Sequence, residues 1–198
     1  MKAANPKRIL LVNAHPDGGN HHLCDALADS YECGALVAGH EVTRRDLATL
    51  DMPLLKSKKE FEDGEVPYQL GNAADDLRSA DHFVFVFPLW LGTMPALLKA
   101  WLEQTFRPGV AFEYLPDGRT ANLLSGKSAR VIVTMGMPAP IYRFWFLSHG
   151  VAGLRRNVLN FTGIKPVRQT YFGMIEQSSG TQRKQWLKTV RELGTRAI

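Results

Sequence analysis

The sequence predicts an α/β domain in which a parallel sheet is covered by helices on both faces. The main observation is a rhythm: a short, almost wholly apolar run, then a turn cluster, then a longer amphipathic segment, repeated along 198 residues. Helices that connect parallel strands cover the sheet on both sides, so such strands are apolar on both faces. The second observation is composition, because 45% hydrophobic and 22% charged residues are ordinary values for a globular chain.

The length predicts one domain over residues 1–198, since such a chain buries about 70% of its unfolded surface without a disulfide or metal. Cys24 and Cys33 have no C-x-x-C spacing, which argues against a disulfide framework or a zinc ribbon. The longest apolar run, 83–92, is about half of a membrane span, and only four apolar residues follow Lys7-Arg8, too few for a signal peptide. We therefore expect a cytoplasmic protein with no membrane insertion.

The strands are expected in order along the chain. Ile9–Val12 forms the first apolar run, and residues 41–45 alternate as in a strand near a sheet edge. Phe83–Phe87 is the second buried run, which Pro88 ends. The remaining two strands are expected at 131–133 and 167–172.

Helices are expected between these strands. An Ala/Leu-rich segment covers about 20–38, and a helix over 94–105 has Pro95 in its first turn, where a missing N–H costs least. The last segment is helical because its apolar residues share one face: Trp186, Leu187, Val190 and Leu193. Five strands and five helices predict a flavodoxin-like doubly wound sheet with strand order 2-1-3-4-5. Residues 47–68 and 106–127 do not fit the rhythm and are expected to leave the sheet.

Ligands of such sheets bind beyond the carboxyl ends of the strands, where the strand order reverses. The first loop expected there has two glycines, which let the backbone approach a ligand, and it precedes a helix start that attracts phosphate. Pro-Asp-Gly also suits an ordinary turn, so the loop alone leaves both interpretations open. Its three histidines have no accompanying Cys or ordered carboxylates, so no metal is expected.

Two further loops are almost uncharged. They follow the strands at 83–87 and 131–133, and apolar loops at that place suit the flat face of an aromatic cofactor. The alternative is that Leu89, Trp90 and Leu91 only cap the core. Tyr142 and His149 lie seven residues apart, close to two helical turns, and could exchange protons with a substrate, although such a spacing is common by chance.

The chain resembles the NAD(P)H:quinone oxidoreductases of the flavodoxin-like fold, the group of DT-diaphorase and its small bacterial relatives. The similarity covers nearly the whole chain, and its most specific part is Pro-Leu-Trp followed by Met-Pro-Ala-Leu-Leu-Lys. The segments that carry it are His15-Pro16, Asp81–Trp90, Met94–Glu103, Arg107–Phe112 and Phe161–Ile164.

The resemblance implies a bound flavin (FMN or FAD), a homodimer and a ping-pong reaction. NAD(P)H would reduce the flavin and leave, and a quinone-like acceptor would then use the same pocket. The resemblance places the flavin phosphate at His15, Gly18, Gly19, Asn20, His21 and His22. It places the flavin ring at Pro88, Leu89, Trp90, Leu91, Gly92, Thr134, Met135, Gly136 and Met137. Tyr142 and His149 match catalytic residues, and Phe112 and Tyr114 match aromatic residues that wall the acceptor pocket near the dimer contact.

Three positions depart from the family pattern. The phosphate loop has Gly, Gly, Asn and His where relatives often have a Ser or Thr hydroxyl, which leaves FMN and FAD both open. Relatives with Gln-Trp-Phe after Pro-Leu have bulkier or more polar groups than Trp90-Leu91-Gly92, so the acceptor size is expected to differ. Tyr142 falls one place off a gapless match.

Two alternative functions fit the same resemblance. One is a flavin-carrying regulatory subunit of a membrane ion-efflux system, because some relatives are ancillary proteins of glutathione-gated potassium efflux. The other is an azo- or nitroreductase, which changes only the acceptor. Nucleic-acid binding is not expected from a net charge of +5, because no run of Lys or Arg exceeds two residues.

Overall fold

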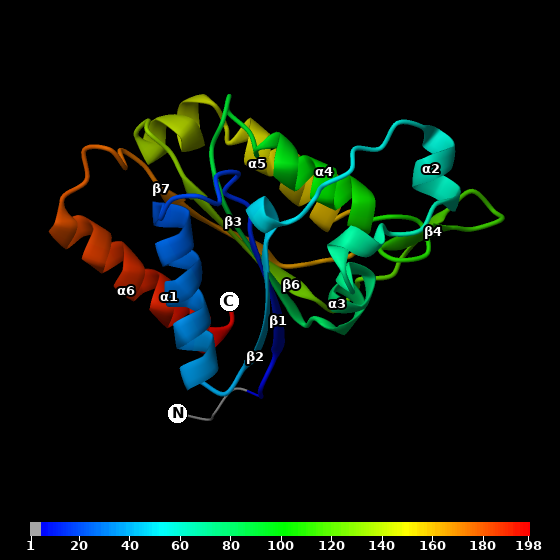
Figure 1. The fold of residues 1–198 in the computed structure, drawn as a ribbon, viewed down its shortest axis with the longest axis horizontal. Coiled ribbons are helices and arrows are strands. Elements are labelled where there is room, and N and C mark those ends of the chain that lie inside the picture. Colours follow the sequence, from blue (N-terminus) through cyan, green and yellow to red (C-terminus); the bar gives the residue numbers. More distant parts are fainter. Residues whose placement is uncertain (1–4) are drawn as a thin grey trace.

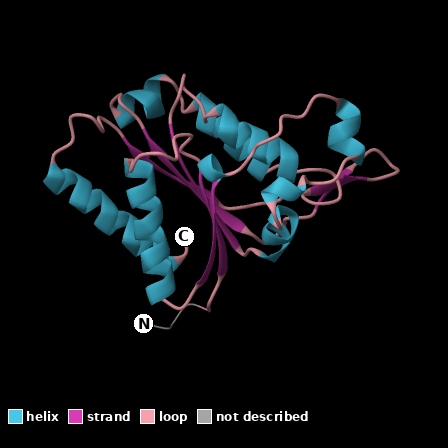
Figure 2. Ribbon diagram, in the orientation of Figure 1, coloured by secondary structure: helices cyan, strands magenta, loops and turns pink. Residues whose placement is uncertain are grey.

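The computed structural model describes residues 5–198 and has a five-stranded parallel sheet at its centre (Figures 1 and 2). Its strands run in the order β2-β1-β3-β6-β7, and every neighbouring pair is parallel. This is the predicted order 2-1-3-4-5, because β4 and β5 lie outside the sheet, and the predicted fold class is confirmed. The strands are β1 (Arg8–Asn13), β2 (Glu41–Asp46), β3 (His82–Pro88), β6 (Ser128–Thr134) and β7 (Val167–Phe172).

The position of each strand follows from its side chains. β3 lies at the centre and is buried along its whole length. β2 has a neighbour on one side only, and its residues are exposed or half-buried, as the alternating pattern of 41–45 predicts. Pro88 is the last residue of β3, whereas the sequence predicted that this strand ends at Phe87, one residue earlier.

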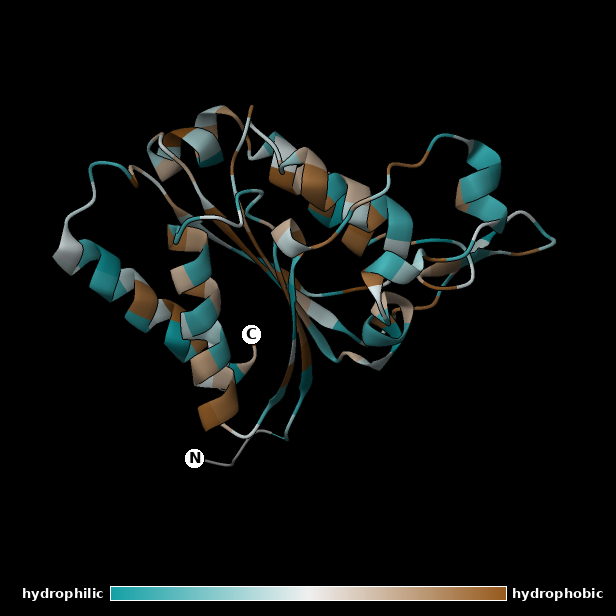
Figure 3. Ribbon diagram, in the orientation of Figure 1, coloured by the Kyte–Doolittle hydropathy of each residue, from teal (hydrophilic) through white to brown (hydrophobic). Residues whose placement is uncertain are grey.

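Helices cover both faces of the sheet, and each face has its own hydrophobic core (Figures 1 and 3). α1 (Leu23–Val37) and α6 (Gly180–Arg196) pack on one face against Ile9 and Val84. α3 (Ala73–Ser79), α4 (Ala96–Thr105) and α5 (His149–Gly153) contribute to the other core, with Phe85 and Phe87. With α2 (Lys58–Asp63), which lies in one of the segments that leave the sheet, residues 5–198 contain six α-helices, one more than expected.

The two segments that did not fit the rhythm do leave the sheet. The first contains α2 (Lys58–Asp63) and two single 3-10 turns. The second forms an antiparallel hairpin of β4 (Phe112–Tyr114) and β5 (Thr120–Asn122), which extends away from the rest of the chain in Figure 1. None of the helices within residues 5–198 is long and apolar enough to cross a membrane.

Tyr142 and His149 do not lie on one helix, so the expected two-turn spacing is wrong. Ile141–Trp145 forms a π-helical turn, and α5 begins only at His149. Between them Leu147 and Ser148 have φ values of 50° and 51°, in the left-handed region that ends a right-handed helix. The break reorients the chain between the two side chains.

Candidate functional site

Three loops meet at the carboxyl edge of the sheet. The His15 ring in the loop after β1 lies edge-on to the Trp90 ring after β3, with 6.4 Å between ring centres. The Leu89 N–H after β3 donates a hydrogen bond to the Thr134 carbonyl at the end of β6, at 2.8 Å. The predicted convergence of the three loops is confirmed.

The loops after β3 and β6 are also joined through Tyr142. Its hydroxyl donates a hydrogen bond to the Gly92 carbonyl at 3.1 Å and accepts one from the Val151 N–H at 3.2 Å. The backbones approach so closely that a Cβ on Gly150 would lie 2.2 Å from the Gly92 carbonyl oxygen. Tyr142 is buried and its hydroxyl already has two partners, so this contact holds the two loops together.

A cavity of about 440 Å³ lies between these two loops. Such a volume is within the usual range for small-molecule sites. Its lining contains no Lys, Arg, Asp or Glu side chain, and both candidate catalytic residues contribute to it. The lining residues are Leu91, Gly92, Thr93, Met137, Tyr142, Phe146, His149 and Gly150.

The edge of this cavity has an unusual backbone. Leu91 has a φ of 47°, and Leu147 and Ser148 are also left-handed, although none is glycine. Non-glycine residues rarely adopt this conformation, and where they do they cluster at ligand sites and switch regions. Leu91 is fully exposed as a result and faces the cavity.

Asp17 organises the loop after β1. Its carboxylate accepts hydrogen bonds from Asn20 Nδ2 at 3.0 Å, from the Gly19 N–H at 2.9 Å and from His22 Nε2 at 2.9 Å. These bonds, with that of Asn20 first, lower the pKa of Asp17 to about 2. The His22 ring stacks on His15 with 3.7 Å between ring centres, and burial together with the His22 charge lowers the pKa of His15.

The start of α1 has free hydrogen-bond donors beside this loop. The His22 N–H donates to Asp25 Oδ2 at 2.7 Å. The N–H groups of Leu23 and Cys24 have no acceptor within residues 5–198, as is usual for the first turn of a helix. Two free N–H groups at the positive end of a 15-residue helix fit a phosphate group.

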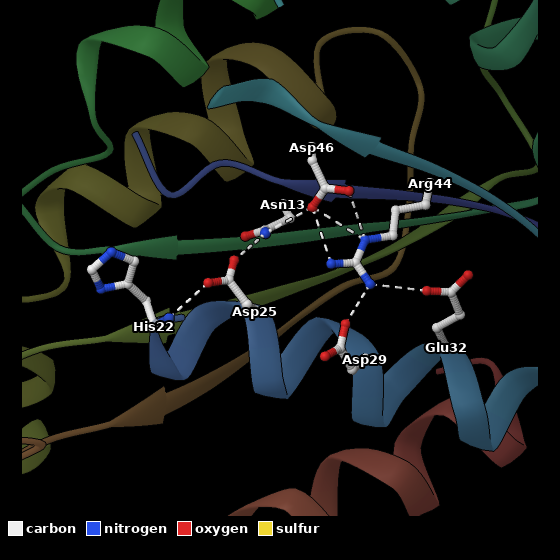
Figure 4. A network of polar contacts seen from close by, with 7 residues as sticks. All are labelled: Asn13, His22, Asp25, Asp29, Glu32, Arg44 and Asp46. Atoms are coloured by element: carbon white, nitrogen blue, oxygen red, sulfur yellow. Dashed lines mark hydrogen bonds and ion pairs between the residues drawn. The ribbon is translucent and has the colours of Figure 1, made fainter. Parts of the chain in front are cut away.

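A polar network supports the loop from the side of β2 (Figure 4). Asn13 Nδ2 donates to Asp25 at 2.7 Å and to Asp46 at 2.9 Å. Arg44 pairs with Asp46 at 2.9 Å, and it also pairs with Asp29 and Glu32 on α1. Sequence reasoning missed this network, because its members are scattered over β1, α1 and β2.

The predicted phosphate residues divide between two cavities. His15, Gly18, Gly19, Asn20 and His21 line a space of about 350 Å³ that the polar network bounds. His22 lies instead in a space of about 230 Å³, where it faces residues that sequence reasoning did not select. The residues of this second space are His21, His22, Leu23, Ile175, Glu176 and Arg183.

Of the residues predicted to frame a ring, only some line the 440 Å³ cavity. Leu91, Gly92 and Met137 do. Pro88, Thr134 and Met135 are buried in the ends of the strands, where they fix the loops. Thr134 Oγ1 lies 3.3 Å from Cys24 Sγ, and burial raises the pKa of that thiol to about 12.

Phe112 and Tyr114 lie elsewhere in the chain. They line a separate apolar cavity of about 270 Å³, in which the Phe112 ring centre is 5.1 Å from that of Phe161. Neither residue lines the cavity that contains Tyr142 and His149. The structure of a single chain therefore does not bring the predicted acceptor wall to the predicted catalytic residues.

Known proteins resemble the chain over nearly its full length. The sequence profile described as flavodoxin-like fold matches residues 7–193. An FMN-dependent NADH:quinone oxidoreductase of Beijerinckia indica is 29% identical over 178 residues, 82% of this chain and 85% of that protein. The human ribosyldihydronicotinamide dehydrogenase [quinone] is 32% identical over 211 residues, 90% of this chain and 86% of that protein.

A solved structure agrees with the sequence comparisons. An NAD(P)H:quinone oxidoreductase from Methanothermobacter marburgensis superposes with a TM-score of 0.81 and covers 96% of both chains at 21% identity, a likeness of fold. The profile match spans the sheet and all the loops at its carboxyl edge. The chain belongs to the flavodoxin-like fold family.

Proposed function

We propose that this chain is a flavin-dependent NAD(P)H:quinone oxidoreductase, a single flavin-binding domain that acts in the cytoplasm. The observation that carries the proposal is that one edge of the sheet holds both a cavity of about 440 Å³ without Lys, Arg, Asp or Glu in its lining and, at the start of α1, free N–H groups that fit a phosphate. Two sequence relatives are named as quinone-reducing enzymes, one of them FMN-dependent, which supports the same activity here.

The chain's residues divide the work of holding a flavin. The N–H groups of Leu23 and Cys24 would bind the phosphate, and the loop that Asp17 organises would surround it. Leu91 and Met137 would enclose the ring, with the backbone of Gly92 at its edge. The cofactor is FMN or FAD.

A flavin, when bound, supplies the hydride chemistry, taking a hydride from NAD(P)H and passing it to the acceptor. The chain's own contribution is placement and proton transfer. The apolar lining excludes water from the donor and the acceptor, which use the cavity in turn in a ping-pong sequence. A quinone that gains a hydride also gains a proton to become a hydroquinone, and the His149 imidazole in the cavity wall donates it.

The proposed active form is a homodimer. Phe144, Trp145, Phe146 and Leu147 expose 47–82% of their surface beside the cavity, and contiguous apolar patches of this kind mark contact sites. Phe112 and Tyr114 do not line this cavity in their own chain, so as acceptor-wall residues they would serve the cavity of a second copy. Analytical ultracentrifugation tests this, and a monomer at assay concentration contradicts it.

The test of the activity is direct. The purified protein should be yellow, and it should oxidise NADH or NADPH when menadione or benzoquinone is added. Heat release of the cofactor followed by chromatography identifies it as FMN or FAD. A colourless protein that neither flavin reconstitutes contradicts the proposal.

A further inference from the structure

The charges of this chain are segregated along the sequence. Between Gly118 and Ile175 there are eight Lys or Arg residues and no Asp or Glu. This stretch supplies most of the cavity lining, from Met137 to Gly150, and the opposite wall, Leu91–Thr93, carries no charge. Of these eight cations, Arg143 lies between the lining residues Tyr142 and Phe146, and Arg155 follows α5, whereas five of the others lie in the hairpin or near the amino ends of β6 and β7.

The cations near the cavity also lack internal partners. Within residues 5–198, several arginines of other regions, such as Arg8, Arg44 and Arg45, form ion pairs with nearby carboxylates. Arg143 and Arg155 form none. An unpaired guanidinium keeps its five donors available for an anion from solution.

Arg143 and Arg155 lie close to the Tyr171 phenol, whose ring packs against the lining residue Tyr142. Arg143 follows Tyr142 in the chain, and its guanidinium carbon is 5.4 Å from the centre of the Phe144 ring. Burial raises the pKa of Tyr171, and the charges of Arg155 and Arg143 oppose that rise, so both lie close to this phenol. The Tyr171 ring is in turn 5.7 Å from the ring of Tyr142, which lines the cavity.

Few carboxylates face this side of the site. Glu176 lies beside Gly136, with its Oε2 3.1 Å from the position that a Gly136 Cβ would take, and Arg183 lines the same small space as Glu176. Asp17 is paired with His22. Arg143 and Arg155 therefore add unpaired positive charge close to the cavity wall.

We propose that this cavity selects aromatic acceptors that carry an acidic group, such as quinone carboxylates or sulfonates, over uncharged quinones of the same ring. The inference rests on the proposed function and names the substrate class of that site. The apolar lining holds the ring, and the two guanidiniums attract the anionic group. A cleft with one sign of charge raises the local concentration and the association rate of its counter-ion, and salt weakens the effect.

The kinetic test compares 1,2-naphthoquinone-4-sulfonate with uncharged 1,2-naphthoquinone at saturating NAD(P)H. The quantity measured is kcat/KM for the sulfonate divided by kcat/KM for the uncharged quinone. The different intrinsic reactivities of the two quinones cancel when this ratio is compared between enzyme variants. We expect Arg143→Gln to lower this ratio about three- to ten-fold, as loss of one nearby charge predicts, and Arg143→Lys to keep most of it. Raising the NaCl concentration should also lower the ratio of the wild-type protein, because salt weakens the attraction of the sulfonate.

Arg191→Gln is the matched control. Arg191 is an exposed cation on α6 without an ion pair in residues 5–198, and its loss changes the net charge equally. We expect its ratio to match the wild type.

A second measurement avoids turnover: 2-naphthalenesulfonate and 2-naphthol are titrated into the oxidised protein, and the change in the visible flavin spectrum gives each Kd. Arg143→Gln should weaken binding of the sulfonate only.

The outcomes separate the two proposals. A ratio of kcat/KM values that is unchanged in Arg143→Gln and Arg155→Gln, and insensitive to salt, overturns the anionic acceptor while the reductase stands. An equal change in Arg143→Gln and Arg191→Gln also overturns it, because the effect would then come from net charge alone. A protein that reduces neither quinone contradicts the proposed function itself.

Discussion

The Tyr142 hydroxyl donates a hydrogen bond to the Gly92 carbonyl, 50 positions earlier in the sequence, at 3.1 Å. This contact joins the loop after β3 to the segment after β6, and the cavity of about 440 Å³ lies between them. The same hydroxyl accepts from the buried Val151 N–H at the start of α5. The shape of the cavity thus depends on a tyrosine for which sequence reasoning proposed a chemical role.

Replacing Tyr142 by Phe should lower the free energy of unfolding by about 1–3 kcal/mol, because the Val151 N–H loses its partner in a buried place. Urea denaturation of both proteins measures the change. Tyr171→Phe is the control, since that hydroxyl donates to the Gln169 side chain in the same strand and its loss leaves no buried backbone N–H without a partner. If Tyr142→Phe slows quinone reduction without loss of stability, the hydroxyl acts on the substrate and not on the loops.

Replacing Gly150 by Ala should disrupt the same junction. A Cβ there would lie 2.2 Å from the Gly92 carbonyl oxygen, so a backbone must move, and we expect a loss of about 1–3 kcal/mol in unfolding free energy with weaker flavin retention. Gly153→Ala in the same helix meets nothing within 4 Å and should instead stabilise the protein by about 0.5–1 kcal/mol. Thermal unfolding of both variants measures their stability, and flavin absorbance measures how much cofactor each retains. Equal effects of the two substitutions would show that the junction tolerates a methyl group.

Replacing His149 by Ala should slow the reductive and oxidative half-reactions by on the order of 100-fold, a usual contribution of a positioned acid or base. The flavin content should not change, because His149 is exposed in the cavity wall and lies outside the loop at 15–22. Stopped-flow absorbance of the flavin follows each half-reaction separately. Unchanged rates would show that His149 is structural and that the proton comes from another group.

Stability should fall in mildly acidic solution because of His82. This side chain is fully buried in β3 and its Nε2 has no partner in residues 5–198, so burial lowers its pKa to about 3 from an ordinary 6.5. Between pH 6.5 and about 3, the unfolded chain therefore binds a proton at His82 that the folded chain does not. The free energy of unfolding should decrease as the pH falls from about 6.5 toward 3.

Urea titrations at pH 7, 6, 5 and 4.5 measure this dependence above the range where most carboxylates titrate. His82→Gln, which can keep a hydrogen bond to Ser128, should flatten the curve between pH 7 and 4.5. A variant that retains the full wild-type slope would assign the acid sensitivity to other groups.

The sheet could be predicted because its strands are defined by local composition. The apolar run at 83–87 and the alternating run at 41–45 distinguish a central strand from an edge strand without any tertiary information. The convergence of the loops could also be predicted, because parallel strands place their carboxyl ends at one edge.

The contacts between the loops could not be predicted in the same way. Arg44 is indistinguishable in sequence from any exposed cation on an edge strand, and its role depends on Asp29, Glu32 and Asp46 reaching the same place. The spacing of Tyr142 and His149 indicated a helix, but left-handed Leu147 and Ser148 break it. Tertiary packing imposes such backbone conformations, and neither residue type signals them.

The thiol of Cys24 lies against Thr134, under the loop that would carry a redox cofactor. Because burial raises its pKa to about 12, almost none of it is thiolate at neutral pH, and the thiolate is the form that peroxide and alkylating reagents attack. A reduced flavin that leaked electrons to oxygen would generate peroxide beside a sulfur atom that cannot respond to it. Iodoacetamide should accordingly label exposed Cys33 and spare Cys24 until the chain unfolds.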